Sequence, residues 1–282
     1  MEINVIGIVG AGLMGSGIAQ VCAHAGINVV LYDISESAVQ RGIASIAANL
    51  DRLVSKEKIA ASDAAAIRAS INGTTEQRGL GNCDFLIEAA TENLEIKQRI
   101  LKELDAVAKP GSIIATNTSS VSITKLAASL SSPDRMVGMH FFNPVPVMAL
   151  VEVIRGIQTS EATFATTQVL VARIGKTAIS ARNSPGFVVN RILVPMINEA
   201  VFVLQEGLAS AEEIDAGMRL GANHPIGPLA LADLIGLDTL LAVMEVFYRD
   251  FNDPKYRPAP LLREMVDAGY FGRKTKKGFY TY

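Results

Sequence analysis

The segment HFFNPVPVMALVE, residues 140–152, contains a histidine and a glutamate that could work together as an acid/base pair. Residue 146 lies midway between His140 and Glu152, and the two prolines suit a bend because they cannot donate to a β ladder. If the segment folds as strand, bend and strand, the two side chains face each other with Cβ atoms about 5 Å apart. The alternative is an ordinary buried core histidine.

The chemistry of such a pair is proton transfer. An imidazole gains and loses a proton near neutral pH, and a carboxylate on its far nitrogen fixes its orientation. Hydride transfer from a secondary alcohol to a nicotinamide requires that the hydroxyl proton be removed. His140 is the candidate for that step if the chain also binds a dinucleotide.

A dinucleotide site is predicted near the start of the chain. Residues 3–9 are apolar and β-branched, Gly10, Gly12 and Gly15 form GxGxxG, and a second apolar strand ends at Asp33. The glycines allow a tight turn, close approach to a pyrophosphate and close packing of helix on strand. Asp33 is placed to accept hydrogen bonds from ribose hydroxyls and to repel the 2′-phosphate of NADP, which favours NAD. The alternative for Asp33 is a helix cap.

The elements that position these residues alternate between strand and helix. We expect strands at 84–89 and 112–116, a helix that begins near Asn93, a helix whose cap is near Ser122, and another strand in RMVGMHFF. This order predicts an α/β fold with a Rossmann-like, doubly wound and mostly parallel sheet, in which ligands bind beyond the carboxyl ends of the strands. Four polar residues are expected to follow such ends: Glu92, Asn117, Ser119 and His140.

The pattern changes after Ser184-Pro185-Gly186, beyond which helical spacing continues and no further strand is evident. We therefore expect an NAD-binding domain at 1–183 and an all-helical second domain at 184–282, with Pro185-Gly186 as a candidate hinge. Within the first domain, residues 35–70 have helical spacing that is interrupted near Ser62-Asp63, where a new N-cap is expected. The apolar segment LALADLIGLDTLLAVMEVF favours a homodimer formed through the second domain.

Composition restricts the class of protein. The net charge is −2 and 19% of residues are charged, so we expect no nucleic-acid partner. Cys22 and Cys83 lie in apolar segments without metal-ligand spacing, which predicts buried free thiols and no metal site. We expect a cytoplasmic protein with no membrane partner. Arg52, Lys56 and Lys58 form either a solvated helix face or a contact for a phosphate-bearing substrate.

Seven motifs occur in a compatible order along the chain: GAGLMGSGIA, EAATENLEIK, ATNTSS, MHFFNPVPVMALVEVI, SPGFVVNR, GANHPIGPLALADLIGLD and GRKTKKGFY. Together they resemble the L-3-hydroxyacyl-CoA dehydrogenase family, and most closely its bacterial stand-alone members. The resemblance covers essentially the whole chain. It implies NAD-dependent, reversible oxidation of (S)-3-hydroxyacyl-CoA to 3-oxoacyl-CoA, with a four-carbon acyl group expected, and a homodimer.

The resemblance also implies roles for individual residues. His140 corresponds to the general acid/base and Glu152 to the residue that orients it, while Ser119 and Asn190 correspond to residues that bind the substrate oxygen. Lys56 resembles a basic residue near the CoA phosphates. The implied cofactor contacts are Gly10, Gly12, Gly15, Asp33, Glu92, Lys97, Ser119, Asn143 and Lys274.

One position departs from the family pattern. The family tail often reads K-[ST]-G-x-G-F-Y, whereas Lys276 stands here at the first glycine, where a positive φ would be unfavourable. Two other functions stay open from the residues alone. One is a dehydrogenase of a free hydroxy acid or sugar acid, and the other is a non-catalytic, crystallin-like NAD-binding protein.

Overall fold

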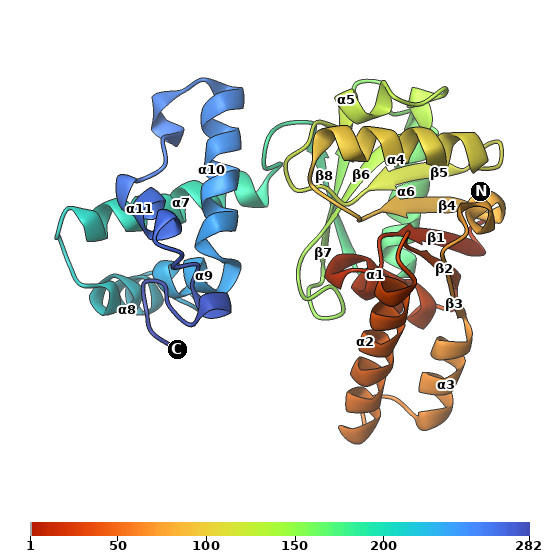
Figure 1. Cartoon of the computed structure of the whole chain (residues 1–282), viewed down its shortest axis with the longest axis horizontal. Helices are drawn as coiled ribbons and strands as arrows, with labels where there is room; N and C mark the ends of the chain where they lie inside the picture. Colours follow the sequence, from red (N-terminus) through yellow and green to blue (C-terminus); the bar gives the residue numbers. More distant parts are fainter. Residues whose placement is uncertain (1) are drawn as a thin grey trace. The chain divides into compact units, whose positions relative to one another are not determined.

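The computed structural model describes residues 2–282. The chain divides into two compact units, Met1–Ser184 and Pro185–Tyr282 (Figure 1). The first unit contains the sheet and the second is helical, as the order of elements shows. Each unit has a hydrophobic core of its own.

The first unit contains one sheet of eight strands among the described residues, in the order β3-β2-β1-β4-β5-β6-β7-β8. The strand pairs are parallel except for β6 with β7, which is antiparallel. This confirms the predicted Rossmann-like, mostly parallel sheet. The strands are β1 (Val5–Val9), β2 (Asn28–Tyr32), β3 (Ile71–Thr74), β4 (Phe85–Glu88), β5 (Ile113–Thr116), β6 (Met136–Phe141), β7 (Leu150–Arg155) and β8 (Thr177–Arg182).

Helices cover both faces of this sheet (Figure 1). One face packs against α1 (Leu13–His24), α2 (Glu36–Ser55), α3 (Ala61–Ala69) and α6 (Glu161–Arg173), whose side chains join the main core cluster. The other face is covered by α4 (Leu94–Val107) and α5 (Ile123–Ala127). The sheet is therefore buried on both sides, which explains why its central strands are apolar almost without interruption.

Alternation along the strands directs a set of buried polar side chains to one face. Val137, Met139 and Phe141 of β6 join the core under α1 and α6, so His140 points to the opposite face. The same alternation turns Glu152 of β7 away from the core formed by Val151 and Val153. Glu88 and Thr116, at the ends of β4 and β5, point the same way, so the α4–α5 side of the sheet carries the polar chemistry.

Two predicted helix starts are confirmed and one is wrong. Asn93 caps α4 and Ser122 caps α5, each accepting a backbone N–H with its side chain. By contrast, α3 begins one residue before Ser62, with Ala60 at the N-cap and no side-chain cap. Asp63 therefore lies at the third helical position, where a carboxylate interacts favourably with the helix dipole without acting as the cap.

The second unit packs five helices around Phe247 and its neighbours, which confirms the predicted helical domain. They are α7 (Val189–Gln205), α8 (Ala211–Gly221), α9 (Pro228–Ile235), α10 (Leu237–Phe251) and α11 (Pro260–Asp267). Two buried carboxylates stabilise this unit. Asp215 accepts the N–H groups of the first turn of α9, and Asp233 accepts two N–H groups of the C-terminal tail.

The described part of the chain contains no helix of the length and apolar character needed to cross a membrane. Both cysteines are free and buried, as predicted. Burial raises the pKa of Cys22 to about 12 and that of Cys83 to about 11, so both thiols stay protonated at neutral pH. They are core residues.

Candidate functional site

The glycine turn between β1 and α1 has the geometry that a dinucleotide requires. Gly10 has φ +101°, and a Cβ there would lie 2.7 Å from Cα of Ala90. A Cβ on Gly15 would lie 1.7 Å from the carbonyl oxygen of Gly10, so helix and turn can pack only with glycine. Gly12 has no atom within 4 Å of its missing Cβ and forms the N-cap of α1 without a side-chain cap. This open helix start is suited to a pyrophosphate.

Asp33 follows β2 and stabilises the glycine turn. Its Oδ2 accepts the N–H of Ala11 at 2.9 Å, and its Oδ1 accepts the N–H of Ser35 at 3.1 Å. The cap of α2 is Ser35, whose hydroxyl accepts the N–H of Ala38, so the alternative assignment of Asp33 as that cap is wrong. Each carboxylate oxygen retains acceptor capacity for a ribose hydroxyl.

A cavity of about 210 Å³ lies beside Asp33. Its walls are mostly apolar, which suits a planar base next to the ribose-binding carboxylate. The residues present thus fit the adenosine half of NAD. The lining residues are Val9, Gly10, Tyr32, Asp33, Ile34, Gln77, Ala90, Thr91, Ile96, Ile100, Glu103 and Leu104.

His140 and Glu152 are paired across β6 and β7. The antiparallel register places their Cα atoms opposite each other, as the spacing about residue 146 predicted. Nδ1 of His140 lies 2.6 Å from Oε2 of Glu152. The Glu152 side chain is fully buried and that of His140 is 8% exposed. His140 lies within β6, one residue before its end, so the expectation that it follows the strand is wrong.

Ser119 lies in the loop between β5 and α5 and is bonded to Glu92, which follows β4. The backbone N–H of Ser119 donates to Glu92 Oε1 at 2.6 Å, and its hydroxyl donates to the same oxygen at 2.7 Å. Asn117 ties this loop to the histidine strand, because its side-chain oxygen accepts the N–H of Phe141 at 2.9 Å. The structure therefore brings Glu92, Asn117 and Ser119 together at the carboxyl ends of β4 and β5, and His140 lies near the carboxyl end of the neighbouring β6.

Lys97, an expected cofactor contact, is enclosed within the first unit. Its side chain is fully buried in α4, and Nζ donates to Glu88 Oε2 at 2.6 Å and to Thr116 Oγ1 at 3.2 Å. Its polar partners and the sheet thus enclose the ammonium. Sequence reasoning missed Glu88 and Thr116, although Thr116 is the last residue of one expected strand and Glu88 the next-to-last residue of another.

The remaining expected contacts lie in several places. Asn143 is exposed in the bend between β6 and β7, and Lys56 is exposed at the C-cap of α2. Asn190 is the second residue of α7, in the second unit. Lys274, also in the second unit, is paired with Asp238.

Residues 5–184 match the model of the 3-hydroxyacyl-CoA dehydrogenase NAD binding domain, and residues 186–282 match that of the 3-hydroxyacyl-CoA dehydrogenase C-terminal domain. The chain belongs to the 3-hydroxyacyl-CoA dehydrogenase family. This confirms the resemblance drawn from the seven motifs. It also confirms NAD as the cofactor class, because the first unit is the family's NAD-binding domain.

Three relatives match the chain over at least 96% of their own length. A 3-hydroxybutyryl-CoA dehydrogenase of Bradyrhizobium diazoefficiens is 50% identical over 280 residues, which are 99% of this chain and 96% of the relative. The crystal structure of (S)-3-hydroxybutyryl-CoA dehydrogenase from Ralstonia eutropha is 63% identical, with a TM-score of 0.98 and coverage of 100% and 99%. The M. tuberculosis FadB2 structure is 40% identical, with a TM-score of 0.97 and full coverage of both chains.

At Lys276, where the chain departs from the family tail, the backbone has the expected unfavourable conformation. Lys276 has φ +59° and ψ 11°, in the left-handed region that favours glycine. Such a conformation costs a residue with a Cβ about 1–2 kcal/mol. The tail keeps its shape because Lys277 and Gly272 exchange backbone hydrogen bonds across the turn.

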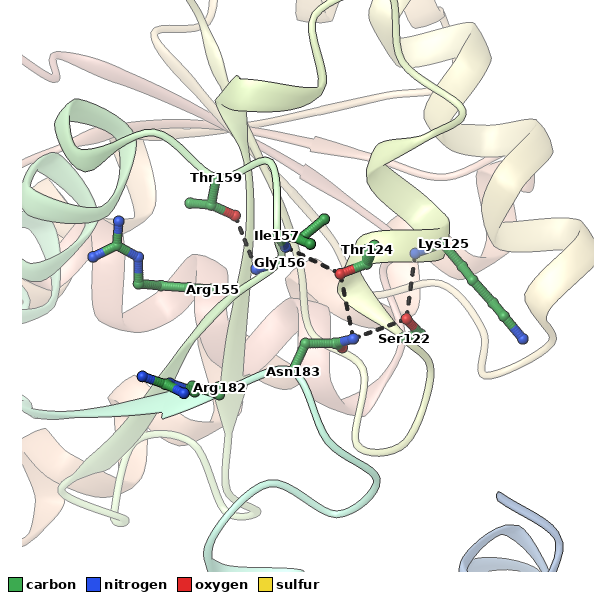
Figure 2. A pocket seen from close by; sticks show the side chains of 9 residues that line it. All are labelled: Ser122, Thr124, Lys125, Arg155, Gly156, Ile157, Thr159, Arg182 and Asn183. Atoms are coloured by element: carbon green, nitrogen blue, oxygen red, sulfur yellow. Dashed lines mark hydrogen bonds between the residues drawn. The ribbon is translucent and has the colours of Figure 1, made fainter. Parts of the chain in front are cut away.

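A second cavity, of about 750 Å³, is lined by none of the predicted site residues (Figure 2). Its polar network is structural: the Asn183 amide nitrogen donates to the hydroxyls of Ser122 and Thr124, and its oxygen accepts the N–H of Ile123. Asn183 thus fixes the start of α5, directly after the Ser119 loop. We locate the candidate reaction centre by the His140–Glu152 pair and not by cavity size.

Proposed function

We propose that this protein catalyses reversible, NAD-dependent oxidation of (S)-3-hydroxyacyl-CoA to 3-oxoacyl-CoA, with 3-hydroxybutyryl-CoA as the four-carbon substrate. The observation that carries the proposal is the buried His140–Glu152 pair in the same sheet as a dinucleotide turn, in a chain whose relatives are named 3-hydroxybutyryl-CoA dehydrogenases. A histidine held by a carboxylate supplies the proton transfer that alcohol oxidation requires. Bound NAD supplies the hydride acceptor.

The geometry assigns separate tasks to the two residues. An ionised Glu152 can only accept a hydrogen bond, so Nδ1 of His140 carries the proton and Nε2 is the basic nitrogen. Nε2 then takes the hydroxyl proton of the substrate during oxidation and returns it to the oxygen during reduction. Glu152 stabilises the imidazolium that forms between these steps, and its burial strengthens that interaction.

Substrate positioning is assigned to residues on both units. We propose that Ser119 and Asn190 bind the oxygen at C3, and that Lys56 interacts with a CoA phosphate from its exposed place at the end of α2. Glu92, Asn143 and Lys274 are assigned to the cofactor together with the glycine turn and Asp33. A hinge at Pro185-Gly186 would let the domains 1–183 and 184–282 close over the substrate and exclude water.

We further propose a cytoplasmic homodimer that associates through the second unit. Several large apolar side chains of that unit are exposed: Ile192 is 67% exposed, Leu208 77% and Leu220 85%. Apolar surface of this kind is covered when identical subunits associate. Light scattering at micromolar concentration should give twice the mass of the chain, and a monomer would contradict the proposal.

Substrate class is tested by initial rates of NADH oxidation. Acetoacetyl-CoA should be reduced much faster than free acetoacetate at equal concentration. The product of acetoacetyl-CoA reduction should be the (S) enantiomer of 3-hydroxybutyryl-CoA. Longer 3-oxoacyl-CoAs, each with NADH and with NADPH, define acyl length and cofactor preference. Equal rates with free acids or a sugar acid would favour the alternative dehydrogenase, and no turnover with any of them would favour a non-catalytic NAD-binding protein.

A further inference from the structure

A fully buried ion pair lies at the carboxyl ends of β4 and β5. The Lys97 ammonium and the Glu88 carboxylate are 2.6 Å apart, and both side chains are 0% exposed. The Thr116 hydroxyl donates to the same Glu88 oxygen at 2.6 Å and accepts from Lys97 at 3.2 Å. All three residues thus share one compact network beneath the loops that carry the candidate site.

A second carboxylate extends this network to Ser119. Glu92 Oε2 lies 3.9 Å from the Lys97 ammonium and accepts the Thr118 hydroxyl at 2.7 Å. Glu92 Oε1 accepts both the N–H and the hydroxyl of Ser119. The Thr118 hydroxyl in turn accepts the N–H of Val121 at 2.9 Å. One carboxylate, aimed by a buried cation, therefore holds the backbone and the side chain of the Ser119 loop.

The other oxygen of Glu88 supports the cofactor side. Glu88 Oε1 accepts the N–H of Ala90 at 2.9 Å. Ala90 is the residue whose Cα would meet a Cβ on Gly10, so it packs directly against the glycine turn. Through Oε1, Glu88 is linked to the dinucleotide turn. Through Oε2, it is linked to Lys97 and, by way of Lys97 and Glu92, to the Ser119 loop.

The position of Lys97 is unfavourable for a cation in two respects. Burial removes its hydration, and it is the fourth residue of α4, near a helix N-terminus whose dipole repels positive charge. A buried ion pair is weak evidence for stability, because apolar residues of similar volume commonly stabilise a protein as well or better. What the cation provides here is placement of two carboxylates, one at the end of β4 and one on the loop that follows it.

We propose that Lys97 is a positioning residue for the reaction, whose buried ammonium, neutralised by Glu88, aims Glu92 so that Glu92 fixes Ser119 at the oxygen of the substrate. This inference rests on the proposed function for the role of Ser119. Lys97 acts on the substrate side through Glu92.

The test uses the double variant Glu88→Gln/Lys97→Met in the full-length protein, which removes both fully buried charges, so that neither is left without its partner. The glutamine introduced in place of Glu88 retains an oxygen for the Ala90 N–H, so cofactor binding should persist. We expect kcat for acetoacetyl-CoA reduction to fall about 10-fold. Amide hydrogen exchange of residues 117–122 should become about 10-fold faster without any ligand present.

A double-mutant cycle separates positioning from general structural support. If Lys97 acts through Glu92, adding Glu92→Gln to the double variant should produce little further loss of kcat, because both changes remove the same restraint on Ser119. The matched control is Asp84→Asn/Lys109→Met, which removes an ion pair near the opposite end of β4. The control should lower stability but leave kcat per folded molecule and exchange at 117–122 unchanged.

Unchanged exchange at 117–122 in the double variant, or full additivity with Glu92→Gln, overturns the inference. If Glu88→Gln/Lys97→Met does not fold, Glu88→Gln/Lys97→Gln keeps a neutral hydrogen-bonded pair and is read by the same criteria. The exchange measurement needs no substrate, so it stands even if the enzyme does not reduce acetoacetyl-CoA. Failure of the proposed function and failure of this inference are thereby distinguished.

Discussion

Nδ1 of His140 lies 2.6 Å from Oε2 of Glu152, on paired antiparallel strands and on the face of the sheet opposite the main apolar core. The distance is that of a charge-assisted hydrogen bond. Because both side chains are buried, the imidazole is held in one orientation before any ligand binds. Pre-organisation of this kind lets the pair transfer a proton without first rearranging.

Replacing Glu152 with glutamine should lower kcat about 100-fold, because the neutral amide no longer stabilises the imidazolium and can present its NH₂ group to His140 in the wrong orientation. Binding of NADH, measured by fluorescence, should be unchanged. The matched control is Glu161→Gln, which breaks an ion pair at the surface between Glu161 and Arg155. Arg155 is the last residue of β7, the strand that carries Glu152. Comparable losses of kcat in both variants would contradict the assigned role of Glu152.

Replacing Asp33 with asparagine should raise KM for NADH about 10-fold, since it removes a charged acceptor from the ribose. The ratio of NADPH to NADH activity should rise, because the charge that repels a 2′-phosphate is gone. Steady-state kinetics with both cofactors measure this. The control is Glu36→Gln, which changes the residue after the Ser35 cap. An unchanged ratio of NADPH to NADH activity in Asp33→Asn would argue against the ribose contact.

Asp84 should make stability depend on pH. Burial acts to raise the pKa of Asp84, but hydrogen bonds from Lys109, Val5 and Asn4 outweigh it and hold that pKa below its usual range. A lowered folded-state pKa stabilises the protein above the unfolded pKa of about 4 and loses this effect as pH falls through the folded value. Asp84→Asn should therefore lower the free energy of unfolding by about 1–2 kcal/mol at pH 7.

The difference between wild type and Asp84→Asn should shrink as pH falls below about 4, because the carboxylate is then protonated in the unfolded chain and, at lower pH, in the folded protein. Urea unfolding at pH 7 and at successively lower pH measures it. A difference that stays constant over this range would show that the ionised form of Asp84 contributes nothing to stability.

Replacing Lys276 with glycine should raise the free energy of unfolding of the second unit by roughly 0.5–1 kcal/mol, because glycine adopts the observed positive φ without strain. Lys277→Gly is the matched control. It should destabilise, since Lys277 lies over the ring of Tyr270 and has no positive φ to relieve. Chemical denaturation measures the free energy of unfolding of both variants. Equal destabilisation by Lys276→Gly and Lys277→Gly would contradict backbone strain at Lys276.

Local patterns predicted the parts of the site that depend on one stretch of chain. The symmetry of residues 140–152 predicted the register of His140 with Glu152, and the glycine spacing predicted the dinucleotide turn. Two strands were not anticipated. β3 contains Asn72 and Gly73, which weaken a strand signal, and β8 is an edge strand whose existence depends on pairing with β7.

Tertiary contacts explain what the sequence did not predict. Lys97 lies near the start of an amphipathic helix, where a lysine is usually exposed, and its burial depends on Glu88 and Thr116 from two neighbouring strands. The prediction that α3 starts near Ser62-Asp63 is wrong for a local reason. An aspartate is favourable in the first turn of a helix as well as at the N-cap, and Asp63 lies in the first turn. Periodicity alone does not distinguish these positions.

The central claim is that His140 transfers the proton during hydride transfer. The most direct measurement is kcat/KM for NADH-dependent reduction of acetoacetyl-CoA by His140→Gln, with folding and NADH affinity verified on the same preparation. The account predicts a loss of about 1,000-fold at unchanged NADH affinity, within the range expected for general acid/base catalysis. A folded, NADH-binding variant with kcat/KM within about threefold of wild type would contradict it.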